Sequence, residues 1–260
     1  MYPNLFQGTQ FEVASWELCL LVGFIVAVIM AIILKPKDFS VSRVGIFGWC
    51  LLMLYMAIFG AKLLFLGLHP LKLEGKALTE VLPGTGYASL GAVLFAMITV
   101  FLFAKIRIKR LSFLVLADYM MPFIFLHLAF VRIGCFLSGC CYGKQTTVPW
   151  GLPFQSYPPV PHHPTQMYSF LFLFFIYFFM RHVYKKSRTK GITFFGTLSL
   201  YGFFRFFVEF FRVDSVKIIG DITLAQITML CIFSISSLFL IRILWVARRK
   251  KTKHRGHREK

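Results

Sequence analysis

Apolar runs of near-membrane length recur along this 260-residue chain and are separated by short polar connections. A helix needs about 20 mostly apolar residues to cross the hydrocarbon core of a bilayer. The predicted spans cover residues 14–34, 44–68, 87–104, 122–141, 165–183, 192–211 and 222–245. The pattern therefore predicts an all-α, polytopic membrane bundle of about seven transmembrane helices.

The fourth apolar region, residues 111–141, is too long for one span and contains Pro122. Proline is favoured in the first turn of a helix and disfavours helix in the residue before it. We therefore expect a short interfacial piece over 111–120, where Asp118 would act as a cap, and a span that begins at Pro122. In that span Arg132 lies about 15 Å along the helix axis, near the middle of the membrane.

Lysine and arginine alternate between the two sides of the predicted bundle. The segments 35–43, 105–110, 181–190 and 248–260 all fall on one side and hold 20 of the 29 basic residues. Because basic residues accumulate on the cytoplasmic side, the N-terminus is predicted to face out and the C-terminus to face the cytoplasm. We expect a single membrane-embedded domain over 1–247.

Composition and net charge support the same interpretation. Hydrophobic residues make up 58% of the chain and charged residues 15%, well below the charged share of soluble domains. The net charge of +19 is mostly a topology signal, so no nucleic-acid partner is expected. The basic cytoplasmic tail, residues 248–260, is expected to rest on anionic lipid headgroups.

The stretch Val131–Gly143, VRIGCFLSGCCYG, places Arg132 in an apolar run and follows it with small residues and thiols. A charge in hydrocarbon costs several kcal/mol unless it has a partner, so Arg132 is a functional hypothesis. The alternative is an arginine that snorkels to the headgroups. Gly134 and Gly143 would allow close approach of backbone or ligand.

The end of the sixth span carries four polar residues on one helical face. Tyr201, Arg205 and Glu209 follow at intervals of four, and Arg212 comes three residues later. With Arg132 these arginines outnumber the single glutamate, and guanidinium forks suit a phosphate. The predicted ligand is an anionic phospholipid headgroup. The alternative is a structural Arg–Glu–Arg clamp between the fourth and sixth spans.

His162 and His163 precede the fifth span and are candidates for a general base, because histidine titrates near neutral pH. The alternative, which we favour for His162, is a turn that caps the helix. Cys135, Cys140 and Cys141 invite a zinc interpretation, but adjacent cysteines lack the usual spacing of zinc ligands. We therefore expect no metal and no cofactor, and small packing residues with incidental thiols.

Taken together, these motifs resemble the prolipoprotein diacylglyceryl transferase family of bacterial membrane enzymes. The family's G-R-I-G-N-F-x-N-G-E-x-x-G is matched from Arg132 as RIGCFLSGCCYG, and its H-P-[ST]-Q-x-Y by His163–Tyr168. Its Y-G-x-x-R-F-x-x-E-x-x-R is matched by Tyr201–Arg212. An upstream Asp-x-x-x-Pro resembles Asp118–Pro122, and the closing G-x-[IL]-[ST]-x-x-Q resembles Gly220–Gln226.

The resemblance implies transfer of diacylglycerol from phosphatidylglycerol to the lipobox cysteine thiol of a prolipoprotein, with release of glycerol phosphate. It also implies a multi-pass protein of the bacterial plasma membrane with its active site toward the outer face. The implied catalytic groups are Arg205, His163 and Glu209. The implied substrate-binding residues are Arg132, Gly134, Gly143, Gln166, Tyr201 and Arg212.

The roles of these residues also follow from the resemblance. Arg132 would bind the donor phosphate, and Arg205 would stabilise the charge of the leaving group. Glu209 and Arg212 would order Arg205. The loop that carries His163, together with Gln166 after it, would shape the outer cavity.

The chain departs from the family pattern at several positions. Cys135 and Cys140 stand where the family has Asn and Glu, and Ser169 replaces a further Glu. A histidine that serves the family as thiol base near the third span has no counterpart. Either His162, His163 or Glu209 removes the proton, or the acceptor is already deprotonated. Two other possibilities are a divergent paralog with another acceptor and a non-catalytic phospholipid-binding protein.

Overall fold

The computed structural model describes most of the chain and divides it into two compact units. The described residues are 4–5, 13–37, 39, 41–68, 91, 95, 98–99, 102, 113–154, 159–187, 189–213 and 217–256. One unit joins residues 1–30 with 117–260, and the other covers residues 31–116. The expected site residues all belong to the first unit.

The helices lie on the predicted apolar spans, although α5 begins before and α8 ends well beyond the predicted bounds. Those in the described part of the chain are α1 (Ser15–Ile33), α2 (Arg43–Leu68), α5 (Phe113–Leu137), α6 (Thr165–Lys186), α7 (Ile192–Glu209) and α8 (Leu224–Gly256). All of these except α7 are long and apolar enough to cross a membrane. The chain is therefore a mostly helical, multi-pass membrane protein. The total of seven spans and the orientation of the termini stay predictions.

The third predicted span, residues 87–104, lies outside the described residues except for a few separate helical positions. Two of these positions contact α2 within their own unit. Gly60 of α2 packs against Phe95, and Gly91 approaches the carbonyl of Gly60 so closely that a side chain would not fit.

Pro122 does not divide the fourth apolar region. Helix α5 runs unbroken through the proline, so the interfacial piece expected over 111–120 is wrong. The helix also ends at Leu137, four residues before the predicted end of the span. Proline removes one backbone donor, but packing in a bundle tolerates this loss. Pro122 is fully buried, and α5 is the most buried of the membrane-length helices.

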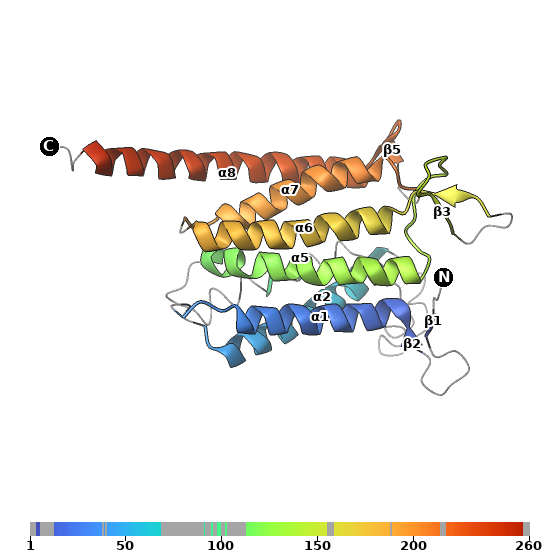
Figure 1. Cartoon of the computed structure of the whole chain (residues 1–260), viewed down its shortest axis with the longest axis horizontal. Coiled ribbons are helices and arrows are strands. Elements are labelled where there is room, and N and C mark those ends of the chain that lie inside the picture. Colours follow the sequence, from blue (N-terminus) through green and yellow to red (C-terminus); the bar gives the residue numbers. More distant parts are fainter. Residues whose placement is uncertain are drawn as a thin grey trace. The chain divides into compact units, whose positions relative to one another are not determined.

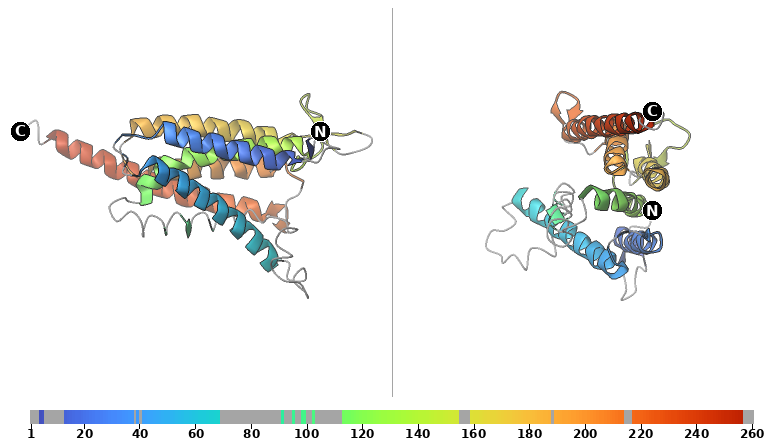
Figure 2. Two further views of the ribbon diagram at one scale, coloured as in Figure 1. Left: turned by 90° about the horizontal axis from the view of Figure 1, so that it is seen from below. Right: turned by 90° about the vertical axis from the view of Figure 1, so that its left-hand side faces the viewer.

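Helices α5, α6, α7 and α8 run alongside one another (Figures 1 and 2). The core between α5 and α6 consists of Phe125, Ala129, Leu173, Ile176 and Met180. Leu200 and Tyr201 of α7 pack against this core. Between α7 and α8, the hydroxyls of Ser199 and Ser237 lie 2.6 Å apart. Aromatic and aliphatic packing thus joins the four helices, and the Ser199–Ser237 contact adds to it.

Asp118 on α5 caps the start of α7. Its carboxylate accepts backbone N–H groups from Gly191 at 2.5 Å and from Phe194 at 2.7 Å. A carboxylate there satisfies donors that lack a partner within the helix and complements the helix dipole. Gly191 has φ 92°, a left-handed conformation that glycine adopts readily. Asp118 is therefore a cap, but it lies within α5 and caps a helix distant in sequence, whereas the sequence predicted an interfacial cap.

Three short antiparallel strand pairs supplement the helices, which the all-α prediction did not include. The pairs are β1 (Asn4–Leu5) with β2 (Val13–Ala14), β3 (Leu152–Pro153) with β4 (Pro161–His162), and β5 (Lys217–Ile219) with β6 (Ile222–Thr223). The last two pairs lie in the α5–α6 and α7–α8 connections, at the same end of the unit formed by residues 1–30 and 117–260 (Figure 1). The site residues gather at that end.

The basic tail is continuous with the last helix. Helix α8 extends to Gly256, so no break in the backbone marks the expected boundary between residues 247 and 248. The guanidinium carbon of Arg249 lies 3.6 Å from the ring centroid of Trp245, a cation–π contact.

Candidate active site

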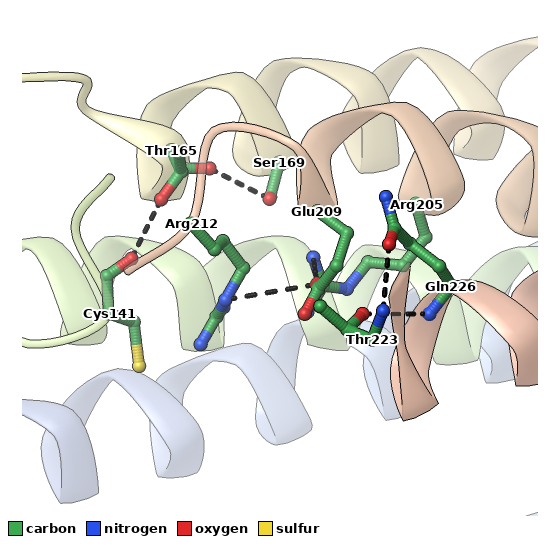
Figure 3. Close-up of polar contacts among 8 residues, drawn as sticks. All are labelled: Cys141, Thr165, Ser169, Arg205, Glu209, Arg212, Thr223 and Gln226. Atoms are coloured by element: carbon green, nitrogen blue, oxygen red, sulfur yellow. Dashed lines mark hydrogen bonds and ion pairs between the residues drawn. The ribbon is translucent and has the colours of Figure 1, made fainter. Parts of the chain in front are cut away.

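The polar end of α7 forms an arginine–glutamate–arginine cluster (Figure 3). Oε2 of Glu209 lies 2.7 Å from Nη1 of Arg205 and 3.9 Å from Nε of Arg212. The Glu209 side chain is 3% exposed, and the two arginine side chains are 14% and 15% exposed. One carboxylate therefore faces two guanidinium groups, and the cluster has surplus positive charge. Arg205 and Glu209 share a face of α7 as predicted, whereas Arg212 lies three residues beyond the end of the helix and reaches Glu209 from the following segment.

The chain after α7 holds Arg212 against the loop that follows α5. The backbone carbonyl of Phe211 accepts the N–H of Lys144 at 2.6 Å. Gly143 and Arg212 form an antiparallel bridge beside this bond. Two segments about 70 residues apart in the sequence therefore meet at the arginine.

Helix α8 begins beside the same cluster with a reciprocal cap (Figure 3). The N–H of Thr223 donates to Oε1 of Gln226 at 2.9 Å, and the N–H of Gln226 donates to Oγ1 of Thr223 at 3.1 Å. This is a capping box, which satisfies two backbone donors at the helix start. The capping box therefore explains the threonine and the glutamine of the motif Gly220–Gln226.

Residues Ser138–Gly143, which we name the thiol loop, turn sharply away from the end of α5. Cys141 has φ 63°, a conformation that costs a non-glycine residue about 1–2 kcal/mol. Oγ1 of Thr165 donates to the Cys141 carbonyl at 2.7 Å, and Nε2 of Gln166 donates to the Cys140 carbonyl at 2.6 Å. Because Thr165 and Gln166 are buried, the first turn of α6 fixes the loop firmly.

Both predicted substrate-binding glycines lie where segments approach closely. The N–H of Gly143 donates to the His163 carbonyl at 2.8 Å. A Cβ on Gly143 would lie 2.5 Å from the Phe211 carbonyl oxygen and 2.7 Å from Cβ of His163. A Cβ on Gly134 would lie 2.8 Å from Cα of Trp16 on α1. Both glycines thus have packing roles, and substrate contact stays a proposal.

The thiols of Cys135, Cys140 and Cys141 form a cluster at the end of α5. Their Sγ atoms all lie within 4.8 Å of one another. Cys140 is exposed, and the other two are half-buried. Hydrogen bonds from Cys135 and Cys140 lower the pKa of Cys141, and the charges of Arg212 and Arg132 lower it further. Hydrogen bonds with the other two thiols, followed by burial, raise the pKa of Cys140.

The argument from cysteine spacing did not anticipate this cluster. Cys135 lies in the last turns of α5, and the left-handed turns at Gly139 and Cys141 fold the chain back toward it. Cys135 and Cys140 have a C-x₄-C spacing, and only the adjacent pair Cys140 and Cys141 lies outside the usual pattern of zinc ligands. The presence of three cysteines in the short motif Val131–Gly143 was the sequence feature that could have predicted the cluster.

The two neighbouring histidines have different environments. His162 is buried, with Nδ1 2.7 Å from the Val160 carbonyl, which agrees with the turn role favoured for it. His163 is half-buried, with Nδ1 3.2 Å from the Tyr168 hydroxyl. That hydroxyl accepts the indole N–H of Trp150 at 2.8 Å, so its own proton is available to His163.

Arg132 lies close enough to the thiol cluster and to Arg205 for its charge to act on both. It is half-buried on α5. Tyr201 lies on the polar face of α7 and packs edge-on against Phe125, with ring centroids 5.2 Å apart. The structure thus brings the predicted cations to one end of the bundle.

Comparison with known proteins identifies the same family that the sequence motifs resemble. Residues 3–246 match the family described as prolipoprotein diacylglyceryl transferase. The chain belongs to this family. Family membership makes it a transferase of lipoprotein biosynthesis.

Several relatives from the family cover most of the chain. A phosphatidylglycerol–prolipoprotein diacylglyceryl transferase of Clostridium tetani is 32% identical over 82% of this chain and 86% of its own length. A relative of the same name from Finegoldia magna is 32% identical over 82% of both chains. A second such enzyme of Clostridium perfringens is 34% identical over 65% of this chain and 66% of its own length.

The departures from the family pattern have distinct structural settings. Cys135 and Cys140, in place of Asn and Glu, both belong to the thiol cluster. Ser169, in place of another Glu, is buried and donates to the Thr165 carbonyl at 2.8 Å. The hydroxyl of Ser169 therefore makes its hydrogen bond within its own helix, α6. The region near the third span where the family has its histidine lies largely outside the described residues.

Proposed function

We propose that this chain transfers diacylglycerol from phosphatidylglycerol to the lipobox cysteine thiol of a prolipoprotein, releasing glycerol phosphate. The observation that carries the proposal is the surplus positive charge around Glu209, where two guanidinium groups face one carboxylate. A cationic site at the end of a membrane bundle suits a phospholipid headgroup that enters from the bilayer. The names of the relatives specify the same donor and acceptor classes.

Arg132 and Arg205 have complementary roles in this reaction. Arg132, half-buried and outside the ion pairs of α7, binds the phosphate of the donor lipid. Arg205 stabilises the charge that develops on the leaving phosphate oxygen. Charge stabilisation in a site of low dielectric is a large catalytic effect, worth roughly 100- to 1,000-fold per donor group.

Glu209, Arg212 and Tyr201 position these charges. Glu209 ion-pairs with Arg205 at 2.7 Å and fixes the direction of its guanidinium group. Arg212 lies 3.9 Å from the same carboxylate, supplies the surplus positive charge and faces the thiol loop through the Gly143 bridge. Tyr201 packs against Phe125 and keeps the polar face of α7 turned toward α5.

His163 and Gln166 complete the site from the start of α6. Gln166 holds the thiol loop through the Cys140 carbonyl. His163 is the proton acceptor that we favour, because Glu209 already faces two arginines. Gly134 and Gly143 contribute through close packing, which lets α1 approach α5 and lets the start of α6 and Phe211 approach the thiol loop.

The proposed setting is the bacterial plasma membrane, with the site toward the outer face. The alternation of basic residues supports this orientation. In the same arrangement the basic end of α8 lies on the cytoplasmic side, where it contacts anionic headgroups at about 1 kcal/mol per basic residue.

A direct test follows the label from donor to acceptor. The purified chain, in nanodiscs, receives phosphatidylglycerol with labelled acyl chains and a synthetic lipobox peptide. We expect labelled peptide and an equal amount of glycerol phosphate. A peptide with Ser for the lipobox Cys, and nanodiscs of phosphatidylethanolamine, are the controls.

The thiol cluster favours a second candidate, a transferase of the same chemistry with another acceptor. Cys135 and Cys140 replace the family's Asn and Glu at the site itself. Glycerol phosphate release that needs a thiol other than the lipobox peptide would support this candidate. Binding of phosphatidylglycerol without any release would instead indicate a non-catalytic lipid-binding protein.

A further inference from the structure

We infer that Cys135, Cys140 and Cys141 bind one zinc ion, whose fourth coordination position takes the thiol of the protein substrate. The inference rests on the proposed function, because that function supplies the thiol acceptor. It deepens the function by assigning the deprotonation of this thiol to a metal site.

The geometry of the cluster fits a single tetrahedral ion. Zinc binds sulfur at about 2.3 Å, which places two sulfur ligands about 3.8 Å apart. The three Sγ atoms already lie within 4.8 Å of one another, so small rotamer adjustments complete the site. Soft thiolate ligands select thiophilic metals such as zinc over calcium or magnesium. Cys140 is exposed and gives the ion a route of entry.

The backbone of the site is fixed before any ion binds. Thr165 and Gln166, both buried, hold the carbonyls of Cys141 and Cys140 at 2.7 Å and 2.6 Å. The left-handed conformation of Cys141 is therefore retained by α6, and Cys135 is fixed by the end of α5. Ligands on a fixed backbone lose little conformational freedom when a metal binds.

The charge of the surroundings suits a metal with three thiolates. Zinc with three thiolates has a net charge of minus one, and a fourth thiolate makes it minus two. The positive charges of Arg212 and Arg132 act at Cys141 and would compensate for the net negative charge of the zinc–thiolate site. The same arginines lie beside the proposed phosphate site, so donor and acceptor would meet there.

Three protein ligands leave one position open, as in catalytic zinc sites. When the substrate thiol binds there, its S–H bond breaks, sulfur bonds to zinc, and the proton passes to His163. The sulfur electron pair then forms the C–S bond to the glycerol carbon of the donor. The C–O bond to phosphate breaks, and the oxygen keeps its electron pair and leaves as glycerol phosphate beside Arg205. No electron transfer occurs, and zinc is redox-inert.

The test uses the full chain, reduced and metal-free, in nanodiscs that contain phosphatidylglycerol. Zinc content is measured by mass spectrometry after equilibration with Zn²⁺, and Co²⁺ serves as a spectroscopic probe of thiolate ligands. We expect one zinc ion per chain and a thiolate-to-cobalt charge-transfer band. Cys135→Ser and Cys140→Ser should weaken zinc binding by more than the roughly 10- to 100-fold typical of outer-shell changes. Cys231→Ser, an exposed thiol on α8, is the matched control.

The fourth position is tested separately with the peptide. A lipobox peptide should change the cobalt spectrum, and the peptide with Ser for Cys should not. Any of four results overturns the inference: no zinc in the reduced wild-type protein, unchanged affinity in both Ser variants, loading of Cu⁺ but not Zn²⁺, or no spectral response to the peptide thiol. The thiolate-to-cobalt band of the wild-type protein tests for thiolate ligands even if the Ser variants do not fold.

Failure of the inference and failure of the proposed function give different results. Transfer at full rate by the metal-free protein would overturn the role of zinc in activating the thiol and support the proposed function. Zinc and thiol binding without transfer from phosphatidylglycerol would support the site and contradict the function.

Discussion

Glu209 is the residue on which the charge arrangement of α7 depends. It is almost fully buried and ion-pairs with Arg205 and Arg212. Glu209→Gln should lower the free energy of unfolding by roughly 3 kcal/mol, because it leaves a buried guanidinium without its counter-charge. Denaturation of the detergent-solubilised protein, followed by circular dichroism, measures this loss.

A paired substitution separates stability from catalysis at the same position. In the double variant Arg205→Met with Glu209→Leu, apolar packing replaces the pair, and most of the stability should return without transfer activity. A Glu209→Gln protein as stable as the wild type would contradict the role given to this carboxylate.

Single residues were predictable where one helix sets their geometry. The spacing of Arg205 and Glu209 placed them one turn apart, and the ion pair follows from that spacing alone. Arg181 was instead counted with the basic connections, yet it is buried, with its guanidinium carbon 4.9 Å from the Phe123 ring centroid. Its aromatic partners include Tyr119, on another helix, and spacing within α6 does not reveal them.

At the scale of elements, Asp118 joins α5 to α7. Asp118→Ala should lower the free energy of unfolding by about 2 kcal/mol, because the N–H groups of Gly191 and Phe194 lose their acceptor. Asp118→Asn keeps an acceptor oxygen and should lose less. Thermal unfolding in detergent compares the two variants, and equal stability of the Ala variant and the wild type would refute the cap.

Gly143 is the point where the thiol loop, the start of α6 and the end of α7 meet. Gly143→Ala would place a methyl group 2.5 Å from the Phe211 carbonyl oxygen, which should destabilise the protein by about 1–3 kcal/mol. Gly48→Ala on α2 is the matched control, because no atom lies within 4 Å of its added Cβ. If both variants unfold at the wild-type temperature, the close packing of the three segments is wrong.

The presence of the membrane helices was predictable because apolar length alone marks them, but the start of α5 and the end of α8 were not. The break expected at Pro122 was wrong, since burial of α5 among its neighbours outweighs the local preference of proline. The thiol loop could not be predicted, because the side chains of Thr165 and Gln166 on a distant helix determine its turns.

At the scale of the whole molecule, the alternation of basic residues predicts a cytoplasmic C-terminus. Green fluorescent protein fused after Lys260 should therefore fluoresce, and alkaline phosphatase fused there should stay inactive. The reverse pattern would place the arginine site on the cytoplasmic side and contradict the proposed orientation.

The most direct test of the central claim compares Arg132→Ala with the wild type in the transfer assay. Labelled peptide and released glycerol phosphate are measured together, and Arg242→Ala, an exposed arginine on α8, serves as the control. We predict that Arg132→Ala slows both products by roughly 100-fold or more while the protein stays folded, and that Arg242→Ala is unchanged. Full activity of the Arg132→Ala protein would contradict a phosphate-binding role for this arginine.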